Sequence, residues 1–243
     1  MTLLDDVLQA HGGAERWAAA TTIRARVRSG GLLVRTRVPG NGFADYRLTV
    51  EVERPYAVLD PFPDSGRRGV FDRGEARIET EAGEVLESRA DPRPAFSGLP
   101  GLRRNLRWDA LDSTYFAGYA MWNYVTTPYL LTREGVEVRE GEPWGQDGEG
   151  WRRLEVTFPS GLDTHSPDQS FYFDSRGLLR RHDYVAEVVG GWARGAHYCA
   201  DHVEADGLTF PTRRRVRPIG PRNGTLPFPT MVWLELSEIA VET

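Results

Sequence analysis

The sequence predicts a mainly β fold in which a large antiparallel meander of short strands carries an inserted, aromatic-rich helix. Two observations predict it. Apolar and polar residues alternate in short stretches on both sides of the chain's middle, with Gly, Pro or Asn between them, as in strands joined by turns. No strand-helix-strand alternation or internal repeat interrupts this series, so residues 1–243 are expected to form one domain.

A helical hairpin is predicted at the start of the chain. Thr2 and Asp5 have the spacing of a capping box, which begins a helix. The residues that follow recur at helical spacing: Leu4, Val7, Leu8 and His11. The pair Gly12-Gly13 ends this helix, and AERWAAA is expected to form a second short helix.

From residue 21 the period changes from helical to two. In TTIRARVRSG the apolar residues Ile23, Ala25 and Val27 alternate with arginines, which is typical of a strand with one face in water. Further stretches are predicted to continue the series of strands: LLVRTRV, YRLTVEVE, AVLDPF, GVFD and ARIET.

The strand pattern stops at Pro92, where a connector rich in Pro and Gly begins. Residues 105–124 then have helical spacing, and Pro128 is expected to stop this helix. The hairpin signals DSRG (residues 174–177) and Asp206-Gly207 mark turns among the later strands. These strands bring the expected total to about eleven or twelve: VEVRE, WRRLEVTF, SFYFD, LLRRHDYVAEVV, AHYCADHVEA, LTFPTRRRVRP and MVWLELSEIAV.

The inserted helix allows two interpretations. Nineteen uncharged residues (113–131) reach the length of a membrane span, but polar residues such as Asn123 and Pro128 interrupt them, so no transmembrane segment is expected. The helix either fills the concave side of the sheet as ordinary core or closes a cavity there, with its rings as walls. Its stripe comprises Leu111, Tyr115, Tyr119 and Trp122, widened by Phe116 and Tyr124.

The composition excludes several classes of function. The net charge is −5 and no basic stretch is interleaved with aromatic residues, so no nucleic-acid partner is expected. All 30 cationic residues are Arg, and the lack of Lys excludes a Walker-type phosphate loop and a Schiff-base lysine. No Gly-x-Gly-x-x-Gly motif follows a strand, so no cofactor is expected. The opening MTLLDDVLQAHGG does not have the pattern of a signal peptide, and a cytoplasmic location is expected.

No metal site is predicted either. Cys199 is the only cysteine, which rules out a multi-cysteine zinc site, and we expect it to be a buried, unreactive thiol. His197 and His202 point to opposite faces of an unbulged strand. His165 and Asp168 lie in DTHSPD, whose Asp and Ser residues are typical of a turn.

Strand parity suggests a set of polar side chains that face inward: His182, Tyr184, Tyr198, His202 and Arg214. His182 and His202 are candidates for proton transfer, because His titrates near neutral pH. Tyr184 and Arg214 are candidates for stabilising negative charge on an oxygen. Such a set suits an isomerase, cyclase or hydrolase that acts on an apolar carbonyl compound. The alternative is that these are ordinary residues of hairpins.

Two passages resemble a known family. SFYFDSRGLLRRHDY (residues 170–184) and EADGLTFPTRRRVRP (residues 204–218) are similar to the strand-turn-strand pattern of the LolA/LolB-like superfamily of lipid and lipoprotein carriers. The order of helical hairpin, meander, inserted helix and final hairpins also resembles that fold, and a bacterial group of about this length within it. The resemblance implies an unclosed β-barrel around an apolar cavity that helices cover. Carriers of the superfamily are exported, whereas this chain opens without a signal-peptide pattern.

We therefore expect the chain to bind a small hydrophobic or lipid-like ligand in a lidded half-barrel cavity. The alternatives are the acid–base enzyme described above and a non-catalytic structural or partner-binding protein whose core is filled. Nothing in the sequence indicates the oligomeric state. The expected ligand-binding residues are Tyr115, Phe116, Tyr119, Trp122, Tyr198 and Phe210.

Overall fold

The computed structural model describes residues 2–38, 40–104, 106–146 and 149–243, and its main feature is one 13-stranded antiparallel sheet. The sheet runs in the order β6-β5-β4-β3-β2-β1-β13-β12-β11-β10-β9-β8-β7. The strands are β1 (Thr22–Gly30), β2 (Tyr46–Glu51), β3 (Tyr56–Asp60), β4 (Arg67–Asp72), β5 (Glu75–Thr80), β6 (Val85–Arg89), β7 (Glu137–Gln146), β8 (Glu149–Thr157), β9 (Asp168–Phe173), β10 (Leu179–Val185), β11 (Arg194–Ala205), β12 (Leu208–Pro218) and β13 (Val232–Glu242).

Two meanders make up this sheet. The first runs from β1 to β6 and the second from β7 to β13, and they join where β1 pairs with β13. Strands β6 and β7 are therefore the two edges, and the sheet is not closed into a barrel. This confirms the expected unclosed, mainly β architecture.

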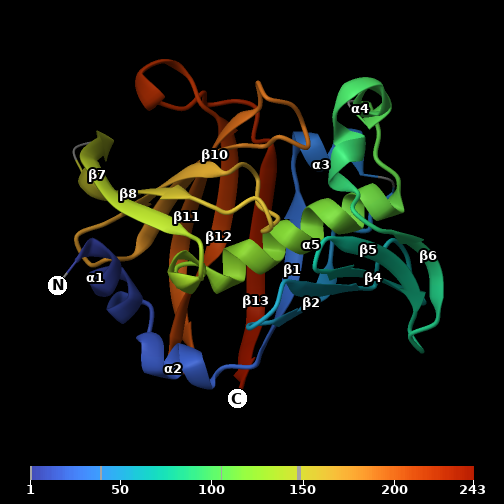
Figure 1. The fold of residues 1–243 in the computed structure, drawn as a ribbon, viewed down its shortest axis with the longest axis horizontal. Coiled ribbons are helices and arrows are strands. Elements are labelled where there is room, and N and C mark those ends of the chain that lie inside the picture. The colour runs from blue at the N-terminus through green and yellow to red at the C-terminus, as the bar shows by residue number, and fades with distance from the viewer. Residues whose placement is uncertain (1, 39, 105, 147–148) are drawn as a thin grey trace.

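The helices connect and cover the sheet (Figure 1). The α-helices are α1 (Leu3–Ala10), α2 (Ala14–Ala19), α3 (Leu32–Arg37), α4 (Gly98–Arg104) and α5 (Ala110–Thr126), and the 3-10 turns are η1 (Arg93–Phe96), η2 (Tyr129–Thr132) and η3 (Pro221–Asn223). The predicted capping box of α1 is present: the Asp5 backbone N–H donates to Thr2 Oγ1 and the Thr2 N–H donates to Asp5 Oδ2. The chain thus opens with the expected helical hairpin.

In the first meander one prediction was wrong and one strand was missed. LLVRTRV forms the helix α3 instead of a strand, because Gly31, at φ +117°, turns the chain out of β1. The first N–H groups of α3 then donate to the backbone oxygens of Thr230 and Met231, at 3.1 and 2.9 Å, which satisfies donors that a helix start leaves free. Strand β6 was not predicted, because its residues are mostly exposed and do not alternate.

Helix α5 lies across the concave side of the sheet and contacts β3, β4 and β5 (Figure 1). Its expected start at residue 105 lies outside the described residues; the helix begins at Ala110, with Asp109 as its cap, and ends before Pro128 as expected. Every residue from Leu111 to Thr126 is buried, so the helix is enclosed on all sides and not only along one stripe. No helix in the described part of the chain is long and apolar enough to cross a membrane.

Gly118 sets how closely α5 approaches the sheet, and its replacement gives a first prediction. A Cβ at this position would lie 2.1 Å from Phe71 Cβ on β4. Gly118→Ala is therefore expected to destabilise the fold by about 3 kcal/mol, although Ala is favoured over Gly in helices by about 1 kcal/mol. Urea unfolding measures the difference.

The matched control is Gly161→Ala, where a Cβ meets nothing within 4 Å. This change is expected to be neutral or stabilising by up to about 1 kcal/mol. A Gly118→Ala variant as stable as the Gly161→Ala variant would contradict the close contact between α5 and β4.

Candidate functional site

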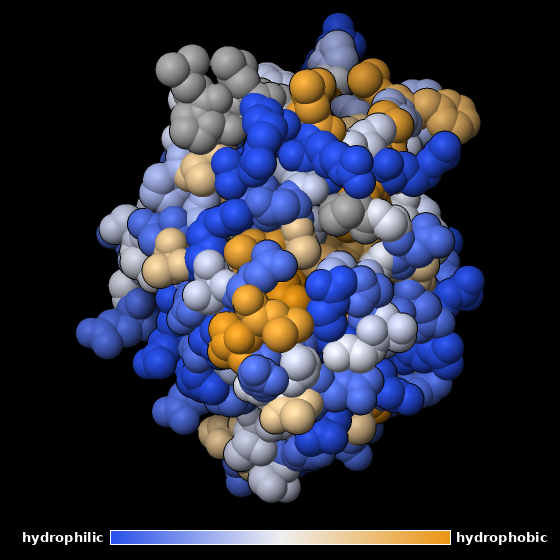
Figure 2. Space-filling view, turned by 90° about the vertical axis from the view of Figure 1, so that its right-hand side faces the viewer, coloured by the Kyte–Doolittle hydropathy of each residue, from blue (hydrophilic) through white to orange (hydrophobic). Residues whose placement is uncertain are grey.

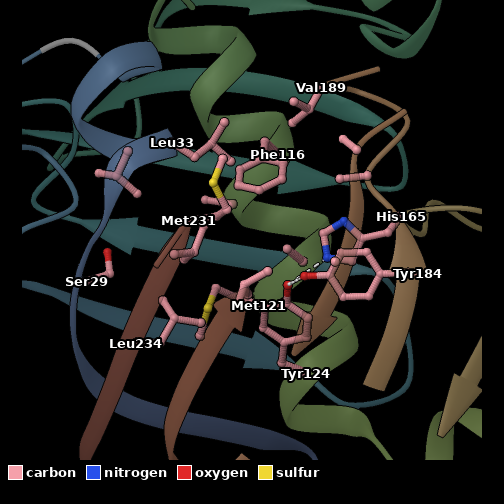
Figure 3. Close-up of a pocket in the computed structure, with 18 of the residues that line it drawn as sticks. Ser29, Leu33, Phe116, Met121, Tyr124, His165, Tyr184, Val189, Met231 and Leu234 are labelled. Atoms are coloured by element: carbon pink, nitrogen blue, oxygen red, sulfur yellow. Dashed lines mark hydrogen bonds between the residues drawn. The ribbon is translucent and has the colours of Figure 1, made fainter. Parts of the chain in front are cut away.

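A cavity of about 220 Å³ lies between α5 and the region of the sheet where the two meanders join (Figure 3). Small-molecule sites are commonly about 300–1,000 Å³, and an apolar cavity of about 150 Å³ is enough for benzene. The space therefore suits a small ring system or one short chain. Its lining comprises Ser29, Leu33, Val34, Phe43, Tyr46, Phe116, Ala117, Ala120, Met121, Tyr124, His165, Tyr184, Ala186, Val189, Trp192, Ala193, Arg194, Gly195, Val216, Pro218, Ile219, Met231, Val232 and Leu234.

Small residues on α5 leave this space open. The helix presents Phe116, Ala117, Ala120, Met121 and Tyr124 to the cavity, which is one continuous helical face. Ala117 and Ala120 are too small to fill the cavity, and the aromatic residues Tyr115, Tyr119 and Trp122 of the predicted stripe do not line it. Across the cavity lie aliphatic and Met side chains from α3, the β12–β13 loop and β13, as Figure 3 shows for Leu33, Met231 and Leu234.

One side of the cavity carries a polar cluster (Figure 3). His165 Nε2 lies 2.6 Å from the Tyr124 hydroxyl, and His165 Nδ1 lies 3.1 Å from the Tyr119 hydroxyl. The Tyr124 and Tyr184 hydroxyls are 3.3 Å apart, and the Tyr184 ring stacks on His165 at 3.9 Å. Arg93 holds the loop that carries His165, since its Nη1 donates to Thr164 O at 2.7 Å.

The cluster is uncharged at neutral pH. Burial and, to a smaller extent, the nearby positive charge of Arg93 together lower the pKa of His165 to about 3. Burial also raises the pKa of the Tyr124 and Tyr184 hydroxyls above their usual range. Neutral imidazole has one donor and one acceptor nitrogen, so one tyrosine donates to His165 and the other accepts from it. The cluster offers a ligand hydrogen bonds without a charge.

Tyr46 adds a second polar group to the lining. Its side chain is almost fully buried, and its hydroxyl forms no hydrogen bond with the residues that the structure describes. Burial raises the pKa of this hydroxyl above its usual range, so it stays protonated. A ligand oxygen or nitrogen in the cavity would be within the reach of this donor.

The predicted ligand-binding residues lie in different places. Phe116 lines the cavity. Tyr115, Tyr119 and Trp122 are buried on other faces of α5, where the Tyr115 hydroxyl donates to Asp163 and Trp122 Nε1 donates to Glu51 O at 2.8 Å. Phe210 is buried in the core outside the cavity lining.

The strand parity predicted for β11 is reversed. His197 and Cys199 are buried, whereas Tyr198 is on the other face, 5.5 Å from the guanidinium of Arg181. Residues paired across antiparallel strands share a face, and Cys199 pairs with Arg214. The turn at Asp206-Gly207 fixes this register, because it pairs Ala205 with Leu208 and hence position 199 with 214. The sequence therefore already contained the information needed to predict which side chains of β11 share a face with Arg214.

The predicted catalytic residues do not converge on one point. Tyr184 lines the cavity, but His182 stacks on Phe171 at 4.2 Å and its Nε2 bonds Gln169 Oε1. His202 is half-buried, with its ring 6.3 Å from that of His11. Arg214 Nη2 donates to the Tyr124 backbone oxygen at 2.9 Å. A catalytic role for these residues remains a prediction.

The histidine that reaches the cavity is His165, which the sequence did not single out for this role. It lies in the loop between β8 and β9, where side-chain direction follows no period. A turn-rich stretch such as DTHSPD gives no sign of which way a side chain points. The aromatic partners on α5 were visible in the sequence, but their common neighbour was not.

Two solved structures show the same architecture over almost the whole chain. A LolA superfamily protein from Nitrosomonas europaea is 11% identical, with a TM-score of 0.51, and a DUF1329 family protein from Desulfovibrio piger is 12% identical, with a TM-score of 0.51. Each match covers 99% of this chain and 92% of the other. No protein-family model and no curated protein matches the chain. The protein therefore has the LolA-like fold, an unclosed β-barrel with α5 across its concave side.

Proposed function

We propose that the protein binds a small apolar ligand that carries one uncharged polar group, in the cavity under α5. The observation that carries this proposal is the apolar cavity of about 220 Å³ with the neutral cluster of His165, Tyr124 and Tyr184 on one side. Burial of apolar ligand surface supplies the binding free energy. The resemblance of two sequence passages to the LolA/LolB-like superfamily of lipid and lipoprotein carriers, together with the LolA-like fold, supports the same class of ligand.

The cluster favours an uncharged polar group such as a hydroxyl, ester or ketone. A charged group placed beside His165 would lose its hydration, and a cation would in addition meet the positive charges of Arg93 and Arg194. The Tyr46 hydroxyl, and the Tyr184 hydroxyl beside its hydrogen bond with Tyr124, are the groups available to bond the ligand. The size of the cavity favours one chain or ring system over a lipid with several chains.

Acid–base catalysis finds less support from the geometry. His182, His202 and Arg214 lie outside the cavity lining. His165 does line it, but a histidine whose pKa is about 3 is a weak base at neutral pH. Binding without turnover is the function that the site supports best.

Filling the cavity tests the proposal. In Ala120→Leu the larger side chain occupies the space of the ligand, and affinity for the fluorescent apolar probe N-phenyl-1-naphthylamine is expected to fall at least about tenfold. The free energy of unfolding is expected to stay the same or rise, because the new methyl groups fill a void. Probe fluorescence and urea unfolding measure the two effects.

The matched control is Ala110→Leu, the same substitution at the start of α5 and outside the cavity lining. Its affinity for the probe is expected to remain that of the wild type. Equal binding by the wild type and both variants would place the probe elsewhere and contradict the proposed site.

A further inference from the structure

Large apolar side chains are exposed at one end of the molecule. They belong to α3, to the segment after α4, to the β10–β11 loop and to the β12–β13 loop. Figure 1 places α3, α4 and the β12–β13 loop at its upper end, and the upper edge of Figure 2, which shares the vertical axis, shows hydrophobic residues there. We call these residues the apolar rim: Leu32, Leu106, Trp192, Leu226 and Phe228, of which Trp192 and Phe228 are 72% and 80% exposed.

The apolar rim adjoins the cavity. Trp192 both lines the cavity and reaches solvent. Leu32 precedes the lining residue Leu33, and the β12–β13 loop that carries Leu226 and Phe228 begins and ends with lining residues. The segment that carries Leu106 is tied to α3, because the Trp108 N–H donates to Arg37 O at 2.8 Å. A ligand that leaves the cavity at this end meets the rim first.

The same segments are strongly basic. Residues 31–44, 97–108, 188–194 and 217–231 contain eight of the chain's 30 Arg residues and none of its 35 acidic residues. Four of these arginines, Arg35, Arg107, Arg194 and Arg222, are exposed and form no ion pair with a residue that the structure describes. This end is therefore positive on a chain whose net charge is −5.

We infer that this end of the molecule docks on the surface of an anionic lipid bilayer. Exposed Trp, Phe and Leu side chains enter the interface between headgroups and acyl chains, while unpaired arginines bind anionic headgroups. The rim residues stand on four separate segments, which suits a fluid surface better than a partner of fixed shape. Docking in this orientation would let an apolar ligand pass between bilayer and cavity without crossing water.

Sedimentation with lipid vesicles tests the inference. The protein is expected to bind vesicles of phosphatidylcholine mixed with phosphatidylglycerol and not vesicles of phosphatidylcholine alone. Arg194→Gln with Arg222→Gln is expected to weaken binding about 25-fold, since each arginine near an anionic surface contributes about a factor of five. Trp192→Ala with Phe228→Ala is expected to weaken it at least about tenfold. High salt should reduce binding as well.

Two double variants far from the rim are the controls. Val85→Ala with Leu86→Ala removes exposed apolar surface from β6, and Arg73→Gln with Arg176→Gln removes two charges from exposed positions elsewhere. Both are expected to bind vesicles as the wild type does. If the wild type ignores anionic vesicles, or if rim and control variants lose binding equally, the inference is wrong.

The Ala120→Leu variant makes this result independent of the proposed function, because it closes the cavity to lipid chains as well as to the fluorescent probe. Ala120→Leu, which closes the cavity, is expected to bind anionic vesicles normally. A thermal melt of each rim variant checks that it folds, and the rim side chains are exposed enough for the wild-type melting temperature to be retained. If a rim variant keeps the wild-type melting temperature but loses vesicle binding, the loss is due to the changed surface and not to unfolding.

Discussion

Lowering the pH from about 7 to 5 is expected to remove a substantial part of the free energy of unfolding of this protein. All five histidines contribute to the loss, because burial lowers the pKa of each, and three of them, His165, His182 and His197, lie near one another. Burial lowers the pKa of His165 to about 3 and that of His182 and His197 well below the usual value of about 6.5. The positive charges of Arg93 near His165, and of Arg214 near His182 and His197, act in the same direction.

The direction of this pH effect follows from whether the folded or the unfolded state binds more protons. Below about pH 6.5 the unfolded chain takes up protons on these histidines while the folded chain does not, so acid favours unfolding. The stabilisation is complete above that pH and is lost as the pH falls toward the folded pKa. His165 alone accounts for about 2 kcal/mol at pH 5, and His182 and His197 add to it. Against a typical total of about 5–15 kcal/mol, this is a substantial part of the stability.

Urea unfolding at the two pH values measures the effect, and His197→Phe tests its cause. Neither ring nitrogen of His197 has a hydrogen-bond partner among the described residues, so Phe leaves no polar group unsatisfied. The variant is expected to be about as stable as the wild type at pH 7 and more stable at pH 5. A wild-type stability that does not change between these pH values would show that the histidines are not buried in the neutral form.

The sequence predicts the parts of the fold in which apolar residues recur with a single period, either that of a strand or that of a helix. Alternation predicts β1, and the turn at Asp206-Gly207 fixes the register of β11 with β12. The stretch LLVRTRV fits two periods, and only the backbone contacts of α3 with the β12–β13 loop decide between them. Strand β6 has no buried face to leave a pattern.

The cavity was harder to predict than the fold for a physical reason. Large aromatic residues draw attention in a sequence, but Tyr115 and Trp122 fill space and are held by hydrogen bonds to Asp163 and Glu51. Empty space forms where side chains are small, at Ala117 and Ala120, and alanine in a helix gives no signal of a site. The polar side of the cavity depends on a loop residue, His165, whose direction only tertiary contacts determine.

Asp112→Ala is expected to cost about 3–5 kcal/mol, the usual penalty for breaking a buried ion pair. Asp112 is the only charged residue in the stretch 111–131, and its side chain is fully buried. Its carboxylate accepts from Arg104 Nε at 2.8 Å and from Arg89 Nη1, and it completes the capping box at the start of α5. Arg104 is itself 8% exposed at the side chain, so removing Asp112 leaves a buried cation without its carboxylate.

The exposed pair of Asp45 and Arg26 provides the matched control, because both side chains are more than 40% exposed. Asp45→Ala is expected to leave the free energy of unfolding close to that of the wild type. Urea unfolding of the two variants compares a buried with an exposed carboxylate on the same chain. Equal losses would contradict the buried position of Asp112.

A double variant separates the two roles of Asp112. In Asp112→Leu with Arg104→Met both buried charges are replaced by apolar groups, so the penalty for an unpaired cation disappears. What remains is the loss of the capping contact, about 1 kcal/mol, because the Asp109 N–H no longer donates to Asp112 Oδ2. We expect the double variant to be more stable than Asp112→Ala by about 2 kcal/mol or more. That difference would assign most of the loss in Asp112→Ala to the unpaired buried charge of Arg104, and only the rest to the lost capping contact at the start of α5.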